Sequence, residues 1–304
     1  MLNLKRIVPD FRVQVKKELE ELKVLEAKNL INNFKNLERI KNFEEIEFKV
    51  FSQFGDDGII QYLIHNLDFE TQIFIEFGVG DYTEANTRFL LINNNWKGLI
   101  IDCEQRYINY IKNEEIYWKY DLTAICNFVT CENINHIFEN NGFKGEVGIL
   151  SIDIDGNDYW IWESIKAVKP VVVIVEYNSI FGLDFALSIP YSPKFQRTKA
   201  HFSNLYWGCS LRALERLGRK KGYYFIGSNS SGNNAYFVRK DKIGRLKPQT
   251  VKSGYVLSKF REARDKKGRL TYVSGYERLK LIQNMPIVDI EKNKRLLLKK
   301  IINT

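Results

Sequence analysis

The stretch IFIEFGVG, residues 73–80, decides the fold, because an apolar run ends there abruptly in glycines and polar side chains. Further runs of the same texture are KGLIIDCE (97–104), EVGILSIDID (146–155) and PVVVIVEYN (170–178). Near-continuous apolar runs are typical of strands covered on both faces, and such strands belong to parallel sheets. Helix-like segments such as NTRFLLINN and WIWESIKAV separate the runs. The pattern therefore predicts a doubly wound α/β fold with a mostly parallel sheet.

The regions on either side of this α/β core differ from it in composition. Between about residues 13 and 40, apolar residues recur at helical spacing among many Lys and Glu, which predicts one or two amphipathic helices. These helices could dock on the core or form the seam of a homo-oligomer. YYFIGSN and NNAYFVRK predict a terminal strand pair, and the basic chain beyond them has helical pieces. We expect an N-terminal helical segment (1–50), an α/β domain (51–240) and a basic C-terminal extension (241–304).

Composition narrows the classes of function. The net charge of +9 favours phosphorylated metabolites, nucleic acid or a membrane surface as partners, or else reflects a solvated basic face. The four cysteines show no paired spacing and the three histidines are scattered, so neither a disulfide framework nor a His-rich metal site is expected. No signal peptide and no apolar run of ~18–20 residues is evident. We expect a cytoplasmic protein without a membrane span.

Acids or amides follow every predicted strand. Because ligands bind beyond the carboxyl ends of strands in open α/β sheets, this convergence predicts a site at that edge. Glycines after the first strand let the backbone approach a ligand closely, and an acid after the second suits ribose hydroxyls, so we predict a nucleoside cofactor. Thr83 stands where a pyrophosphate-binding fold would have its third glycine. The residues at the strand ends are Glu76, Gly78, Gly80 and Asp81; Asp102 and Glu104; Asp121, after IYWKY (116–120); Asp153 and Asp155; and Glu176 and Asn178.

The stretch LSIDIDGNDYWIW, residues 150–162, carries an unusual group of acids. Asp153 and Asp155 would share one face of a strand, because side chains repeat with period two, and they would repel each other unless a cation lay between them. With Glu176 and Asn178 they form an all-oxygen set suited to Mg²⁺, Mn²⁺ or Ca²⁺. A metal-free acid/base role for Asp153 or Asp155 is the alternative. Asn157 or Asp158 is expected to cap the following helix.

Several of these motifs resemble those of class I S-adenosylmethionine-dependent methyltransferases, in the right order. FIEFGVGDYTEANT (74–87) followed by WKGLIIDCE (96–104) is similar to the first two motifs of that class. LSIDIDGNDYWIWESI and VVVIVEYN resemble the fourth and fifth strands of FkbM-like members, FSQFGDDGII (51–60) resembles the segment before the first strand, and 208–239 the closing helix and strand pair. The resemblance covers about residues 51–239 and implies a Rossmann-like fold that binds S-adenosylmethionine.

The resemblance also implies roles for single residues. Some class I O-methyltransferases hold a divalent metal at the ends of the fourth and fifth strands, where the ion lowers the pKa of the attacking hydroxyl; here that implies Mn²⁺ or Mg²⁺ on Asp153, Asp155, Glu176 and Asn178. Around the cofactor it places Gly78 and Gly80 beside the methionine moiety, Glu76 on the loop or the amino group, Asn86 or Thr87 on the carboxylate, Gln53 at the same end, Asp102 on the ribose, Asp121 on the adenine amino group, and Asp153 at the edge of the cofactor site. Asp81 departs from the small residue that many relatives carry.

We therefore expect an enzyme that O-methylates an anionic or carbohydrate-linked small molecule, such as a surface-glycan precursor. Asp155 and Glu176 would orient the acceptor oxygen, and without a metal His201 is the best general base. The segment 191–208 reads as a substrate lid whose Lys194, Arg197 and Lys199 suit an anion.

Two other classes of function remain as alternatives. An NAD-dependent oxidoreductase requires a third glycine and a catalytic Lys/Tyr or His pair, which are not evident. A non-catalytic nucleic-acid-binding module could use the basic extension, although the acids at the strand ends oppose nucleic acid in the cleft.

Overall fold

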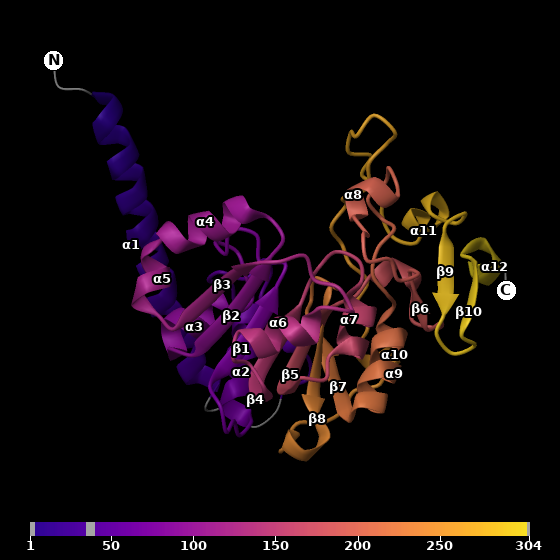
Figure 1. Cartoon of the computed structure of the whole chain (residues 1–304), viewed down its shortest axis with the longest axis horizontal. Coiled ribbons are helices and arrows are strands. Elements are labelled where there is room, and N and C mark those ends of the chain that lie inside the picture. Colours follow the sequence, from indigo (N-terminus) through magenta and orange to yellow (C-terminus); the bar gives the residue numbers. More distant parts are fainter. Residues whose placement is uncertain (1–3, 35–39, 303–304) are drawn as a thin grey trace.

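The computed structural model describes residues 4–34 and 40–302, and a seven-stranded sheet forms its centre (Figure 1). The strand order is β3-β2-β1-β4-β5-β8-β7, and only β8 runs antiparallel to its neighbours. This arrangement confirms the doubly wound, mostly parallel α/β fold. The strands are β1 (Ile73–Phe77), β2 (Lys97–Asp102), β3 (Leu122–Cys126), β4 (Gly145–Ile152), β5 (Val168–Glu176), β7 (Tyr223–Ser228) and β8 (Asn234–Arg239).

Helices cover both faces of the sheet, which is why its strands read as unbroken apolar runs. In β1, Phe74 packs into one apolar layer, whereas Ile75 and Phe77 pack into the layer on the opposite face. The first layer contains α2 (Asp56–Asn66), α3 (Arg88–Asn94), α4 (Gln105–Asn113) and α5 (Glu115–Lys119); the second contains α6 (Ile134–Asn140), α7 (Asp158–Ser164) and α9 (Leu211–Lys221).

The third strand lies one segment later than the sequence predicts. Residues 116–119 of the IYWKY run belong to the short helix α5, in which Ile116 is buried and Trp118 is exposed. The strand β3 begins only after Asp121. Asp121 therefore lies at the amino end of β3, where its carboxylate pairs with the ammonium of Lys97 at 3.3 Å. That end of the sheet is opposite to the predicted site.

The N-terminal segment forms one helix, α1 (Leu4–Phe34), within the described residues. Its last turns dock on the α/β core, because Ala27 packs with Phe51 and Phe89. Leu19, Leu22 and Leu25 stay exposed, and the helix extends beyond the body of the molecule (Figure 1). A homo-oligomer seam along this helix stays a prediction. Among the described residues, no helix has the length and apolarity to cross a membrane.

The C-terminal extension forms strands that the sequence did not predict. β9 (Pro286–Asp289) pairs with β10 (Lys294–Leu297) and, on its other edge, with β6 (Leu187–Ser188), so the extension shares a small sheet with the preceding region. A separate apolar cluster, including Leu205, Ile287 and Leu298, lies beneath this sheet. The domain boundaries expected from the sequence stay predictions. The short helices here are α8 (Arg197–Ala200), α10 (Val251–Gly254), α11 (Glu277–Leu281) and α12 (Lys299–Ile302).

Candidate functional site

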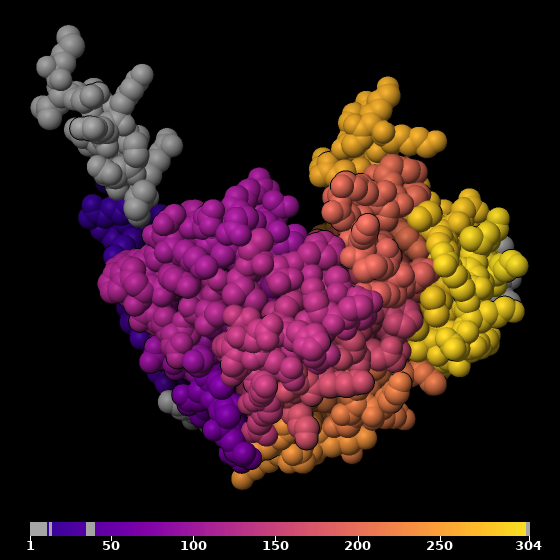
Figure 2. Space-filling view, viewed as in Figure 1, coloured from indigo at the N-terminus to yellow at the C-terminus, as the bar shows by residue number. Residues whose placement is uncertain are grey.

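A cleft of about 790 Å³ lies beyond the carboxyl ends of the central strands, at the point between β1 and β4 where the winding of the sheet reverses. This volume falls within the usual range for small-molecule sites, and the switch point is where open α/β sheets bind ligands. Figure 2 shows the surface hollowed between the magenta part of the body and the salmon and orange lobe. Of the predicted site residues, those that line the cleft are Gln53, Gly78, Gly80, Asp102, Asp153, Asp155 and Glu176.

The loop after β1 requires glycine for two different reasons. Gly78 has φ +80°, and a Cβ there would lie 1.6 Å from the carbonyl oxygen of Asp153, so the backbones that leave β1 and β4 touch. Gly80 has φ +55°, but no heavy atom lies within 4 Å of its Cβ position, so the missing side chain leaves open space at the cleft. Asp102 accepts hydrogen bonds from the backbone N–H groups of Gly80 and Glu104, each at 2.8 Å. Asp102 thereby fixes the floor of this half of the cleft.

A buried carboxylate beneath this floor holds the next loop. Glu76, which is 4% exposed, accepts hydrogen bonds from the backbone N–H groups of Asn86 at 2.9 Å and Thr87 at 3.0 Å, and from the Thr87 hydroxyl. Burial raises the pKa of Glu76. The Asn86 amide donates to the hydroxyl of Ser151. Asn86 and Thr87 therefore bind Glu76 and are not among the residues that line the cleft, and their contact with a cofactor carboxylate stays a prediction.

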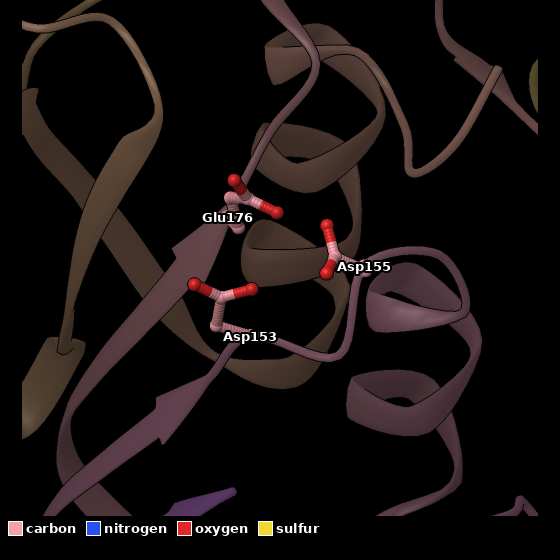
Figure 3. Close-up of side chains that lie close together, drawn as sticks. All are labelled: Asp153, Asp155 and Glu176. Carbon is pink, nitrogen blue, oxygen red and sulfur yellow. The ribbon is translucent and has the colours of Figure 1, made fainter. Parts of the chain in front are cut away.

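Three acids converge at the ends of β4 and β5 (Figure 3). Asp153 and Glu176 point toward each other from neighbouring strand ends, and Asp155 faces them from the loop. One oxygen from each lies within 4.8 Å of the others, and this is the only such group of three among the parts of the chain that the structure describes. The convergence does not arise from strand periodicity, because β4 ends at Ile152 and Asp155 has φ +56°, a left-handed conformation that is rare outside glycine. A tight turn aims Asp155 back at its neighbours.

The electrostatics of this acid cluster differ between its members. Burial raises the pKa of Asp153 well above its usual range, and the negative charges of its neighbours raise it further. Burial and the negative charge of Asp153 likewise raise the pKa of Glu176 well above its usual range. Asp155 instead forms an ion pair with the guanidinium of Arg197, whose other nitrogen bonds Glu262. Asp153 and Glu176 are thus a pair of carboxyl groups without a basic partner among the described residues.

The acid cluster fits a hard divalent cation. One oxygen of Glu176 is buried with no hydrogen-bond partner among the described residues, and a buried polar atom without a partner is costly. An all-carboxylate donor set is the kind that Mg²⁺ and Mn²⁺ prefer. Arg197, which also lies 4.6 Å from the centre of the Trp207 ring, pairs with Asp155, so its positive charge already offsets that carboxylate. A cation at the cluster would compete with Arg197 for that carboxylate.

Two other predicted site residues, Asn178 and His201, are not among the residues that line the cleft. The amide nitrogen of Asn178 donates to the backbone carbonyls of Leu205 and Trp207 at 3.0 Å each, and its oxygen accepts from the N–H of Ile180, so this side chain braces a loop. His201 bonds the hydroxyl of Ser203 at 2.7 Å and does not line the cleft, and burial lowers its pKa.

The remaining acid of the 150–162 stretch has a local role. Asp158 accepts hydrogen bonds from the backbone N–H groups of Ile154 and Gly156, each at 2.9 Å, and is fully buried. Burial raises its pKa to about 6. Asp158 therefore fixes the turn that carries Asp155. Asn157 is the N-cap of α7, but its amide donates to the carbonyl of Ser192 instead of capping the helix.

Several cleft residues were missed or misread from the sequence. Glu104 lines the cleft with an exposed carboxylate, and from the sequence it is distinguished only as an acid at a strand end. Asn127 and Phe128 follow β3, whose position was mispredicted. Phe260 and Glu262 come from the C-terminal extension, for which the sequence offered no signal of a place at the cleft.

No protein-family model matches the chain, and no curated protein matches it. Solved structures show partial similarity. An S-adenosylmethionine-dependent methyltransferase from Clostridium acetobutylicum ATCC 824 has a TM-score of 0.39 and 10% identity, over 60% of this chain and 90% of that one. The N-terminal domain of EvdMO1 with SAH bound has a TM-score of 0.40 and 11% identity, over 76% and 97%. An O-methyltransferase from Bacillus cereus in complex with SAH has a TM-score of 0.38 and 13% identity, over 71% and 88%.

The fold class follows from the chain itself. Its strand order, with a single antiparallel strand between β5 and β7, is the Rossmann-like arrangement of class I methyltransferases.

Proposed function

We propose that the chain is an S-adenosylmethionine-dependent methyltransferase. The observation that best supports this function is the division of the cleft into two halves with different chemistry. Over β1, β2 and β3, a glycine loop adjoins two acids and an aromatic ring, Phe128. Over β4 and β5, the acid cluster adjoins residues from the C-terminal extension. The first half suits a nucleoside, and the second suits a polar acceptor.

The first half fits the cofactor by shape and by charge. The open space beside Gly80 leaves room for a ligand against the backbone. The carboxylate of Glu104 is more than half exposed and lies 3.7 Å from the guanidinium of Arg106, which leaves it able to accept hydrogen bonds from ribose hydroxyls, while Asp102 holds the loop. Phe128 offers an exposed apolar face to a base. The acids around the cleft also favour a positively charged ligand.

The acid cluster would act on the acceptor. When bound, S-adenosylmethionine supplies an electrophilic methyl group on a positively charged sulfur. Asp155 and Glu176 would orient the acceptor hydroxyl, and the Asp153–Glu176 pair would accept the proton which that hydroxyl loses as its oxygen takes the methyl group. A raised pKa makes the carboxylate form of these groups a stronger base.

In the alternative mechanism, a divalent metal ion assists the deprotonation of the acceptor. Asp153, Asp155 and Glu176 would hold Mn²⁺ or Mg²⁺, which would supply positive charge that makes an acceptor hydroxyl easier to deprotonate. We infer O-methylation of a polar small molecule, such as a sugar-linked precursor, in the cytoplasm. The carboxylates inside the cleft oppose an anionic group at the reacting end of that molecule.

Calorimetric titration tests the proposal directly. The full chain would be titrated with S-adenosylhomocysteine and separately with NADH, each with Mn²⁺ and with EDTA. We expect S-adenosylhomocysteine to bind and NADH not to bind, and the Glu104→Gln variant to lose affinity. NADH binding alone would favour the oxidoreductase alternative, and binding of neither ligand would overturn the methyltransferase proposal. If Mn²⁺ binds the parent but not Glu176→Gln, the acid cluster is a metal site.

A further inference from the structure

The charges around the cleft are divided between its interior and its rim. Six acids line the interior, and Arg197 is the only basic residue among the lining side chains. Arg197 is already paired with two of these acids. A phosphate in the interior would therefore meet unpaired carboxylates at short range, so a negatively charged part of an acceptor must lie outside. The lining acids are Asp102, Glu104, Asp153, Asp155, Glu176 and Glu262.

The rim carries the opposite charge on residues 259–272, which we call the prong. It contains six basic and two acidic residues. Both acids are neutralised within the structure, because Glu262 pairs with Arg197 and Asp265 pairs with Arg269 at 2.8 Å. The side chains of Lys259, Arg261, Lys266 and Lys267 are exposed and form no ion pair with any described residue. In Figure 2 the orange prong rises above the salmon residues beside the hollow.

Contacts at the base of the prong hold this charge beside the cleft. Phe260 stacks on Phe54 with ring centres 5.7 Å apart and an angle of 17°, and both rings line the cleft. The backbone N–H of Arg264 donates to the carbonyl of Ser203 at 3.2 Å. With the bond between Glu262 and Arg197, these contacts tie the prong to two other parts of the chain, at Phe54 and in the segment 191–208.

The tip of the prong is also ordered by its own hydrogen bonds. Asp265 accepts from the backbone N–H groups of Lys267 and Arg269 at 2.8 and 3.0 Å, and the guanidinium of Arg264 donates to the carbonyl of Gly268. The guanidinium of Arg261 lies 5.7 Å from the centre of the Tyr272 ring. The backbone that carries these cations is thus ordered at its tip, and its base lies at the cleft through Phe260 and Glu262.

We propose that the prong binds a phosphate- or pyrophosphate-bearing part of the acceptor substrate, while the neutral hydroxyl end enters the acidic interior. This inference rests on the proposed methyltransferase function. Arg261, Lys266 and Lys267 hold the anion, and the charge of the interior acids keeps it at the rim. The C-terminal extension thereby determines specificity for the acceptor, and the glycine loop half of the cleft binds the cofactor independently.

Inorganic tripolyphosphate is the probe for this site, titrated into the full chain by calorimetry at low ionic strength. The test variant is Arg261→Gln/Lys266→Gln/Lys267→Gln. The matched control is Lys144→Gln/Lys166→Gln/Lys169→Gln, which removes three exposed charges at the opposite end of β4 and β5. We expect the test variant to lose at least about tenfold in affinity and the control less than about twofold. Both variants should bind S-adenosylhomocysteine as the parent does.

Three results would overturn the inference: no binding of tripolyphosphate to the parent, an equal loss in the control, or displacement of tripolyphosphate by S-adenosylhomocysteine, which would put the anion inside the cleft. Tighter binding of a short single-stranded oligonucleotide than of tripolyphosphate would also overturn it, in favour of a polynucleotide ligand. The S-adenosylhomocysteine titration separates the two proposals. If that ligand does not bind the parent, the methyltransferase proposal fails; if it binds and tripolyphosphate does not, only the prong proposal fails.

Discussion

Replacing Arg197 by Gln should destabilise the fold and at the same time favour cation binding. The Arg197 side chain is only 15% exposed, and it joins Asp155, on the turn after β4, to Glu262, in the C-terminal extension. Its Nε also donates to the carbonyl of Asn204 at 2.8 Å. Removing one partner of a buried ion pair costs about 3–5 kcal/mol, because the other charge is left buried and unpaired.

The magnitude here should be smaller, because the two acids are not fully buried. Asp155 is 58% exposed, so its arm contributes about 1 kcal/mol or less. Glu262 is 29% exposed, which leaves it partly desolvated after the change. We expect a loss of about 2–4 kcal/mol in the free energy of unfolding. For a chain of this size that corresponds to a decrease in Tm of about 4–8 °C.

Urea and thermal unfolding in EDTA measure this loss. The control is Arg212→Gln, which removes a more exposed guanidinium (42%) paired with Glu291 at 3.1 Å and should cost less than about 1 kcal/mol. A double-mutant cycle with Glu262→Gln should give a coupling of at least about 1 kcal/mol. A loss below about 0.5 kcal/mol, or zero coupling, would refute the reasoning. The Arg197→Gln change also releases Asp155 from its ion pair. The variant should therefore bind Mn²⁺ about tenfold more tightly than the parent does.

Further predictions concern pH and the nucleoside half of the cleft. Because the folded-state pKa of Asp153 lies above its unfolded value, its contribution to stability is present at low pH and is lost as pH rises through the folded pKa. Asp153→Asn should therefore raise Tm in EDTA at pH 8 and flatten the profile of Tm between pH 5 and pH 8; an unchanged slope would contradict this. Gly80→Ala should weaken S-adenosylhomocysteine binding at least about tenfold, whereas Gly142→Ala, at a glycine with φ +81° and equally open space away from the cleft, should not; calorimetry would show equal affinities if the reasoning were wrong. Gly78→Ala should destabilise the fold by more than about 3 kcal/mol, because its Cβ would meet the Asp153 carbonyl, and urea unfolding would measure the loss.

The central sheet was predictable because its strands are covered on both faces. IFIEF and PVVVIV leave no polar face, and glycines or acids mark where they end. β3 was not predictable in the same way, because LTAIC is short and only two of its residues are buried. The neighbouring aromatic run IYWKY has a stronger strand pattern, although most of it is helical. The misplacement carried Asp121 to the wrong end of the sheet and concealed Asn127 and Phe128.

The candidate site was predictable only as far as strand ends define it. Asp153 and Glu176 follow directly from the ends of β4 and β5, whereas Asp155 joins them only through the left-handed turn after β4. Asn178 lies two residues after Glu176, as a second ligand on the same strand would. Its amide instead donates hydrogen bonds to the carbonyls of Leu205 and Trp207 in a neighbouring loop. The place of Glu262 depends on the way the extension folds back on the body, through contacts distant in sequence such as β9 with β6. Local pattern contains no information of that kind.

The pairing of β9 with β6 also has a consequence for the order in which the molecule forms during synthesis. Domains generally fold as the chain emerges, at ~5–20 residues per second. The seven-stranded sheet is complete once β8 has emerged, whereas Phe260 and Glu262 reach the cleft wall only when later residues are available. A nascent chain would thus carry a finished nucleoside half before its acceptor half is closed. Acceptor selection would therefore be established after cofactor binding during synthesis.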